Sequence, residues 1–412
     1  MGALDLVGNA VAVLALGALL ATAWRHPSWR TEVAVSVLAA GSVVAVGLVD
    51  LGAAGTTVAD LLPVVAFLVA ILVVGEVCAA VGLFVAVADR VRRGRPRPYV
   101  LLTRVVLVAA AVTTVLSLDT TVVLLTPVVL AAATSAGMSA RPGVHACLRM
   151  ANSASLLLPV SNLTNLLALP HLDLSFAGFA ARMAPVLAVV LLVEWALLRL
   201  LFRRELRGTT GPAPAPRPLP RVPGLVVALM LAGFAVLSPL GVEPAWVAGV
   251  AAMVLVGWGR RRRVLEVRDV VAGAHPSFAL FVLALGVVVA GLATGFVGDL
   301  VTDLLPTSTS YVGLLGIAGV ATLLANLVTN LSATLLVVPL AAPLGEAGVL
   351  AALLGLNIGA GLTYTGSLAN LLWRRGLARQ VEHVSLAELH RVALVVTPVS
   401  LVAAVTVLHL TT

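Results

Sequence analysis

A single acid, Asp119, lies in a part of the chain that is otherwise apolar enough to be buried in lipid. Residues 117–127 read SLDTTVVLLTP, with VVLVAAAVTTVL before them and further apolar residues after them. At that depth an ionised carboxylate costs at least about 2.5–3.5 kcal/mol. Asp119 must therefore be protonated, face a hydrated cavity or meet a cation, and each of these gives it a chemical role.

Hydroxyl and amide groups interrupt apolar stretches at three further places. Such side chains offer both hydrogen-bond donors and acceptors, and a helix that breaks there adds free backbone groups. Together they suit a small, neutral, hydroxylated solute or a partly dehydrated cation. The candidate substrate-binding residues are Ser117, Thr120 and Thr121 beside the acid, Ser161, Asn162, Thr164 and Asn165, Asn326, Thr329, Asn330 and Ser332, and Thr363, Thr365, Gly366, Ser367 and Asn370.

Asp119 is the candidate for proton coupling, because a buried acid can take up a proton on one side of a membrane and release it on the other. The alternative is that its carboxylate caps a half-helix by accepting backbone N–H bonds. Glu76, within AILVVGEVCAAVGLF, could be a second proton-coupling group or only a packing acid. Glu194 lies about one turn before Arg199 and could pair with it.

The composition is that of an integral membrane protein. Of the 412 residues, 60% are hydrophobic and 11% are charged, whereas soluble domains carry about 25% charged residues. The two cysteines, Cys78 and Cys147, lie in separate segments and predict neither a disulfide framework nor a thiolate metal site. Every basic residue is an arginine, and these lie in short runs between apolar spans. That pattern indicates membrane topology and not nucleic-acid binding.

The apolar spans predict about ten transmembrane helices, since a helix of about 20 apolar residues crosses a bilayer. Two further stretches, 100–136 and 309–344, are too long for one crossing and are polar in the middle. The predicted membrane helices are residues 3–23, 33–51, 62–88, 150–169, 176–201, 223–241, 244–259, 276–297, 348–372 and 389–410.

The arginines predict the orientation in the cytoplasmic membrane. By the positive-inside rule, one orientation places every arginine except Arg182 in the cytoplasm, with the N-terminus outside. Stretch 100–136 then enters and leaves from the cytoplasm, and stretch 309–344 enters and leaves from outside. Both are expected to be re-entrant helical hairpins with polar tips near mid-membrane, where protein or a hydrated cavity must surround them.

The two halves of the chain repeat the same pattern. A cytoplasmic Pro- and Arg-rich linker, 203–222, separates residues 1–202 from residues 223–412. SLDTTVVLLTPVVL aligns with TNLSATLLVVPLAA, and SASLLLPVSNLTNLL aligns with IGAGLTYTGSLANLL. Each half thus has one hairpin, 100–136 or 309–344, and one broken helix, 150–169 or 348–372. Because the halves start on opposite sides, the predicted fold is an all-α, inverted-repeat membrane protein, an architecture typical of secondary transporters.

Four segments hold the polar residues of the hairpin tips and helix breaks, namely SLDTTVVLLTP, ANSASLLLPVSNLTNLL, ANLVTNLSATLL and NIGAGLTYTGSLANLLW. These segments resemble the ArsB arsenite-efflux permeases. These permeases belong to the ion transporter superfamily, together with NhaD sodium/proton antiporters and divalent-anion/sodium symporters. The resemblance implies a substrate site between the two hairpin tips and the two helix breaks, at the candidate residues given above. The superfamily's anion symporters carry S-N-T at the tips and P-P-N at the breaks, whereas this chain has S-L-D and T-N-L, then L-T-N and L-A-N.

The expected function is export of arsenite and antimonite in exchange for protons, with no enzymatic activity, cofactor or metal site. Arsenous acid suits the candidate residues because it is neutral at pH 7 and presents only hydroxyls. The alternatives are an ion-coupled dicarboxylate or sulfate permease, a Na+/H+ antiporter, or a channel. An anion would gain most from arginine side chains, and none is expected at mid-depth. A homodimer and an arsenite-stimulated ATPase partner are both compatible with the sequence.

Overall fold

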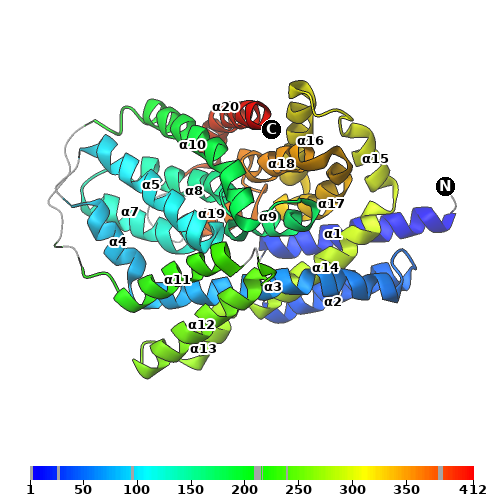
Figure 1. Cartoon of the computed structure of the whole chain (residues 1–412), viewed down its shortest axis with the longest axis horizontal. Coiled ribbons are helices and arrows are strands. Elements are labelled where there is room, and N and C mark those ends of the chain that lie inside the picture. Colours follow the sequence, from blue (N-terminus) through cyan, green and yellow to red (C-terminus); the bar gives the residue numbers. More distant parts are fainter. Residues whose placement is uncertain are drawn as a thin grey trace.

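The computed structural model describes residues 3–25, 28–93, 97–207, 215, 217–237, 240–378 and 384–412, and every regular element in them is a helix (Figure 1). Eight helical stretches in this part are long and apolar enough to cross a membrane. They confirm an all-helical membrane protein. Within the predicted linker, residues 208–214 and 216 lie outside the described part.

Most of the first four helices and of the helices that directly follow the linker pack together along the lower side of Figure 1, whereas Phe296–Leu304 lies at the upper right. The predicted helix 62–88 is wrong in its limits. The chain instead forms one long helix to Ala80, turns at Gly82 with φ +76°, and starts a new helix at Leu83. These elements are α1 (Ala3–Arg25), α2 (Trp29–Ala45), α3 (Leu51–Ala80), α4 (Leu83–Val91), α11 (Arg221–Leu237), α12 (Pro244–Arg261), α13 (Val267–Ala274), α14 (Pro276–Ala293) and α15 (Phe296–Leu304).

Two helix pairs correspond to the predicted hairpins. In the first, α5 (Pro98–Leu116) is followed by a short helix α6 (Leu118–Thr120), a π-helical turn and α7 (Thr126–Ser135). The start of α5 and the end of α7 line one apolar cavity together, so these two arms run in opposite directions. In the second, α16 (Tyr311–Val328) packs against α17 (Asn330–Ala341).

Two helices are interrupted where the sequence predicts breaks. The first consists of α8 (Arg141–Ser153), two 3-10 turns and α9 (Leu163–Ala168), and α10 (Phe176–Leu201) follows it. The second consists of α18 (Gly345–Asn357), a 3-10 turn and α19 (Leu368–Ala378), and α20 (Leu386–Thr411) follows it. Both broken helices begin earlier than predicted, at Arg141 and Gly345.

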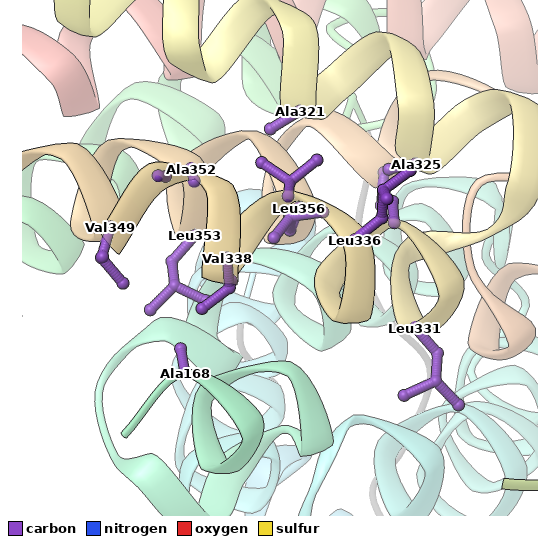
Figure 2. Packing of buried hydrophobic residues seen from close by; sticks show 14 of the residues in the cluster. Ala168, Ala321, Ala325, Leu331, Leu336, Val338, Val349, Ala352, Leu353 and Leu356 are labelled. Atoms are coloured by element: carbon purple, nitrogen blue, oxygen red, sulfur yellow. The ribbon is translucent and has the colours of Figure 1, made fainter. Parts of the chain in front are cut away.

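The largest hydrophobic cluster surrounds the second broken helix. Figure 2 shows Ala168 of α9 facing Leu353 of α18 and Val338 of α17. Small residues allow close approach: a side chain at Gly355 would collide with the carbonyl oxygen of Ala318 in α16. This packing holds α9, α16, α17 and α18 as one unit around the breaks.

Helix α8 changes the place expected for Arg149. The positive-inside rule assigned Arg149 to a cytoplasmic connection, but it is buried within a helix, as are His145 and Cys147. Glu194 pairs with Arg149 and not with Arg199, whose guanidinium lies over the ring of Trp195. The arginine pattern alone does not identify Arg149 as buried, because the acid that neutralises it, Glu194, comes from another helix.

Candidate functional site

Both hairpin tips turn at a hydroxyl residue with a strained backbone. Ser117 has φ 99° and ψ 163°, and Thr329 has φ 70° and ψ 154°. This region is populated almost only by glycine and costs of order 1–3 kcal/mol for other residues. Each hydroxyl lies near another three residues on, Ser117 to Thr120 at 3.4 Å and Thr329 to Ser332 at 3.3 Å. The two tips therefore share one local structure.

Two predicted site residues are bonded to the first arm of the first hairpin. The Thr121 hydroxyl lies 2.7 Å from that of Thr113, across the bend of the first hairpin. Ser161 donates to the carbonyl oxygen of Thr114 at 2.6 Å and so ties the first break to the same hairpin. Both residues fix the geometry of the backbone around the site.

An asparagine holds each helix break open. The side-chain amide of Asn165 donates to the carbonyl oxygens 10 and 7 residues before it, at 2.7 and 3.0 Å. Asn370 donates to the carbonyl oxygens at the same two spacings, at 2.9 and 2.8 Å. These carbonyl groups have lost their helical partners at the break, and an unpaired buried carbonyl is costly. The two predicted residues thus satisfy the backbone of their own broken helix.

Two further asparagines, which the sequence analysis missed, join the breaks to each other. Asn152 of α8 donates to Asn370 at 2.8 Å, and Asn357 of α18 donates to Asn165 at 3.0 Å. The signal was present in the sequence, because Asn152 and Asn357 each come 13 residues before the asparagine of their own break. The aligned segments began one residue too late to include them.

The residues next to these asparagines complete a buried polar network. Ser367 donates to the side-chain oxygen of Asn152 at 3.2 Å. The side-chain oxygen of Asn357 accepts from Asn162 and, at 3.0 Å, from Thr164. Every residue of this network is buried. Fully paired polar networks of this kind fix one arrangement of the helices around them.

The second hairpin and the second break are bonded directly. The side-chain oxygen of Asn326 accepts from the backbone N–H and the hydroxyl of Thr363, at 2.9 and 2.8 Å. The Thr363 hydroxyl lies 3.0 Å from that of Thr365. At the tip, the backbone N–H of Asn330 donates to the carbonyl oxygen of Gly366 at 2.9 Å. The four predicted clusters are thus brought into one region.

A small cavity of about 40 Å³ lies where the clusters meet. Its polar lining comes from both tips and the first break, while α19 contributes only apolar residues of the second. Among the described residues, the Asp119 carboxylate has no hydrogen-bond partner, so it does not cap the half-helix. The polar lining residues are Ser117, Asp119, Asn162, Thr164 and Asn330.

A larger cavity of about 260 Å³ also has Asp119 in its lining. Glu76 of α3 lines it, so the structure brings both predicted proton-coupling residues to one space. Glu32 of α2 and His275, between α13 and α14, also line it. Within the described part of the chain, no group of three or more His, Cys, Asp or Glu side chains could hold a metal ion.

One buried ion pair contacts the backbone of the second break. Arg149 donates to Glu194 at 2.6 Å and to the carbonyl oxygen of Gly361 at 3.2 Å, while Thr397 accepts at 2.8 Å. Ser153 also donates to Glu194, at 2.8 Å. Arg149 therefore lies beside the second break, and its charge is neutralised by Glu194.

Known proteins resemble this chain in sequence and in fold. The sequence profile of the CitMHS family, described as citrate transporters, matches residues 18–354. Arsenical pump membrane proteins from Escherichia coli and Yersinia enterocolitica are 28% identical over 351 residues, which cover 80% of this chain and 82% of theirs. The YdaH transporter of Alcanivorax borkumensis has the same fold, with a TM-score of 0.61 at 17% identity over 87% of this chain and 86% of that one.

These matches confirm the resemblance to the ArsB-type permeases at the level of distant relatives. They also exclude an enzyme, because the matching family and the relatives are membrane transporters. The family profile covers most of the chain, including both hairpins and the first broken helix. This multi-pass membrane protein is therefore a secondary transporter that belongs to the CitMHS family.

Proposed function

We propose that the protein exports arsenite and antimonite across the cytoplasmic membrane in exchange for protons. The observation that carries the proposal is the position of Asp119, which lines both the small polar cavity and the larger cavity. An acid between two cavities can respond to the substrate on one side and to protons on the other. The distant similarity to arsenical pump membrane proteins supports the same substrate class.

The small cavity suits a neutral, hydroxylated solute. Its polar groups are hydroxyls from Ser117 and Thr164 and amides from Asn162 and Asn330, which can donate and accept. Arsenous acid presents three hydroxyls and no charge at pH 7, so it can exchange hydrogen bonds with such groups without needing an arginine.

Substrate export is coupled to proton entry because the substrate and the proton compete for Asp119. Protonated Asp119 is neutral and can stay in its buried position without a partner, whereas the ionised form needs water or a bonded solute. Substrate hydroxyls that donate to the ionised carboxylate would stabilise it, and a proton would replace them after substrate release. Outward movement of substrate is then tied to inward movement of a proton.

The proposed transport cycle uses the two halves as inverted repeats, residues 1–202 and 223–412, joined by the cytoplasmic linker 203–222. Both hairpin tips lie near mid-membrane in this proposal, one entering from each face. The shared tip geometry at Ser117 and Thr329 and the matching amide bonds of Asn165 and Asn370 support it. Alternating access would then come from movement of one part of the protein past another.

The test is uptake of radiolabelled arsenite by everted membrane vesicles with an imposed pH gradient, acidic inside, in the absence and presence of sodium. The wild-type protein should accumulate arsenite without sodium, and Asp119→Asn should accumulate none. Asp299→Asn, which changes an exposed acid on α15, should behave as wild type. Gradient-driven uptake by Asp119→Asn at the wild-type rate would refute the role of Asp119.

An ion-coupled anion carrier is the second candidate, because the matching family is described as citrate transporters. The same vesicles distinguish the two. Radiolabelled citrate or sulfate uptake, or arsenite uptake that requires sodium, would favour the anion carrier or a Na+/H+ antiporter. The neutralised Arg149 offers little help to an anion, since its side chain is bonded to Glu194, Thr397 and Gly361.

A further inference from the structure

The larger cavity is lined by acidic and basic side chains from four separate segments. Glu32 comes from α2, Glu76 from α3, Asp119 from the first hairpin tip, and His275 from the junction of α13 and α14. The other segments around it, α1 and α19, contribute the apolar residues Ala23, Leu368 and Leu372. The cavity therefore joins four titratable groups, of which only two were assigned a role above.

Close contacts show where Glu76 lies along the cavity, between the interior and the surface. Gly75 lies so near the Thr120 hydroxyl that an added methyl group would meet it at 3.1 Å. The next residue, Glu76, packs its side chain on Gly273, where a methyl group would lie 2.9 Å from the Glu76 Cβ and Cγ atoms. Glu76 thus lies between the hairpin tip and the α13–α14 junction.

The other end of the cavity reaches solvent. His275 is exposed and Glu32 is half-buried. His275 has φ 45° because it ends α13 and begins α14, and this turn brings it to the mouth of the cavity. Glu32 follows the connection that holds Arg25 and Arg30, and α13 alone separates His275 from the connection at Arg260 to Arg263. The positive-inside rule predicts that these connections are cytoplasmic.

We propose that the larger cavity is the route by which Asp119 exchanges protons with the cytoplasm, with Glu76 midway and Glu32 and His275 at the mouth. This inference rests on the proposed proton exchange at Asp119 and adds its path. Substrate occupies the small cavity, which shares Asp119 with the larger one, so the proton and the substrate leave by different spaces. During export a proton leaves Asp119, is carried by water and the Glu76 carboxylate, and enters the cytoplasm.

The first test blocks the cavity chemically. Ser277 lines it and can be replaced by Ser277→Cys, while the two native cysteines are buried. In everted vesicles, a bulky membrane-impermeant thiol reagent should reduce gradient-driven arsenite uptake by Ser277→Cys several-fold. It should leave arsenite–arsenite exchange intact, because exchange needs no net proton movement. The matched control is Ala272→Cys, an exposed residue of α13 that does not line the cavity, and its labelling should change neither rate.

The second test changes the mouth without adding bulk. Glu32→Gln and His275→Ala should each slow gradient-driven uptake several-fold and shift its pH profile, again with normal exchange. The controls are Glu243→Gln and His409→Ala, which change an acid and a histidine outside the cavity lining.

Three outcomes would overturn the inference. Complete labelling of Ser277→Cys with unchanged gradient-driven uptake would show that protons take another path. Loss of exchange together with gradient-driven uptake would make the cavity the substrate's path. Wild-type vesicles that show no gradient-driven arsenite uptake would refute the proposed function itself, and the path with it, before any variant is compared.

Discussion

The side-chain amide of Asn152 donates to Asn370 at 2.8 Å and so joins the first half of the chain to the second at the two helix breaks. The same bond is repeated in the opposite sense, from Asn357 to Asn165 at 3.0 Å. Each break is thereby held by its own asparagine and by one from the other half. The breaks cannot separate without losing both bonds.

Loss of one partner in this network should be costly. Asn152→Ala leaves the Asn370 side-chain oxygen without its donor, and a buried unsatisfied group costs about 1–3 kcal/mol. We expect the free energy of unfolding, measured by denaturant titration in mixed micelles, to fall by this amount. The double variant with Asn370→Ala should lose less than the sum of the two single losses, since the interaction can be removed only once.

The control cycle combines Asn152→Ala with Thr406→Val. Thr406 lies in α20 and is bonded to Tyr311, so it shares no partner with Asn152. These two changes should add. Additive losses in the Asn152–Asn370 cycle as well would contradict the network described above.

The strained tip at Thr329 should prefer glycine to alanine. Both substitutions remove the hydroxyl, but only glycine adopts φ 70° and ψ 154° freely. Thr329→Gly should therefore be more stable than Thr329→Ala by about 1–3 kcal/mol. The control is exposed Thr302 in helix α15, where alanine should be the more stable of the two by about 1 kcal/mol. If alanine were the more stable substitution at Thr329 as well, the backbone of the tip would not be strained.

Gly75 should matter for transport and not for stability. In Gly75→Ala the new methyl group would lie 3.1 Å from the Thr120 hydroxyl and press on the residue beside Asp119. We expect gradient-driven uptake to fall several-fold. Gly55→Ala, in the same helix with nothing within 4 Å, should transport normally and gain about 0.5–1 kcal/mol of stability. Normal uptake by Gly75→Ala would show that α3 does not position the tip.

The buried pair of Arg149 and Glu194 should be more costly to break than to replace. Their exposed fractions are 2% and 0%, so Arg149→Met alone leaves an unpaired buried acid and should cost about 3–5 kcal/mol. The double variant Arg149→Met with Glu194→Leu should recover much of that loss. Thermal unfolding of the wild-type protein and the two purified variants in detergent measures the difference. A double variant less stable than Arg149→Met would contradict this account.

Much of the site could be predicted from local sequence signals. Polar residues inside apolar stretches marked the bends at Ser117 and Thr329 and the breaks near Asn165 and Asn370, since buried polar groups need a structural or functional reason. The acid pair Asp119 and Glu76 was also found in this way. Their meeting at one cavity required the fold.

The remaining features depend on contacts between distant segments. Asn152 and Asn357 lie at the ends of α8 and α18, and their equal spacing from Asn165 and Asn370 marks them as equivalent positions. That spacing gives no sign of a partner more than 190 residues away. Arg149 looked like one more cytoplasmic arginine because its partner, Glu194, comes from a different helix. Glu32 and His275 lie near predicted connections and gain a role only because α2, α3 and α14 pack together.

The bond between Asn357 and Asn165 also has a consequence for synthesis. The two residues are 192 positions apart, and a chain leaves the ribosome from its N-terminus. The first broken helix therefore lacks this hydrogen bond until most of the second half has been synthesised. Its final geometry is acquired late, and a chain released early could not finish it.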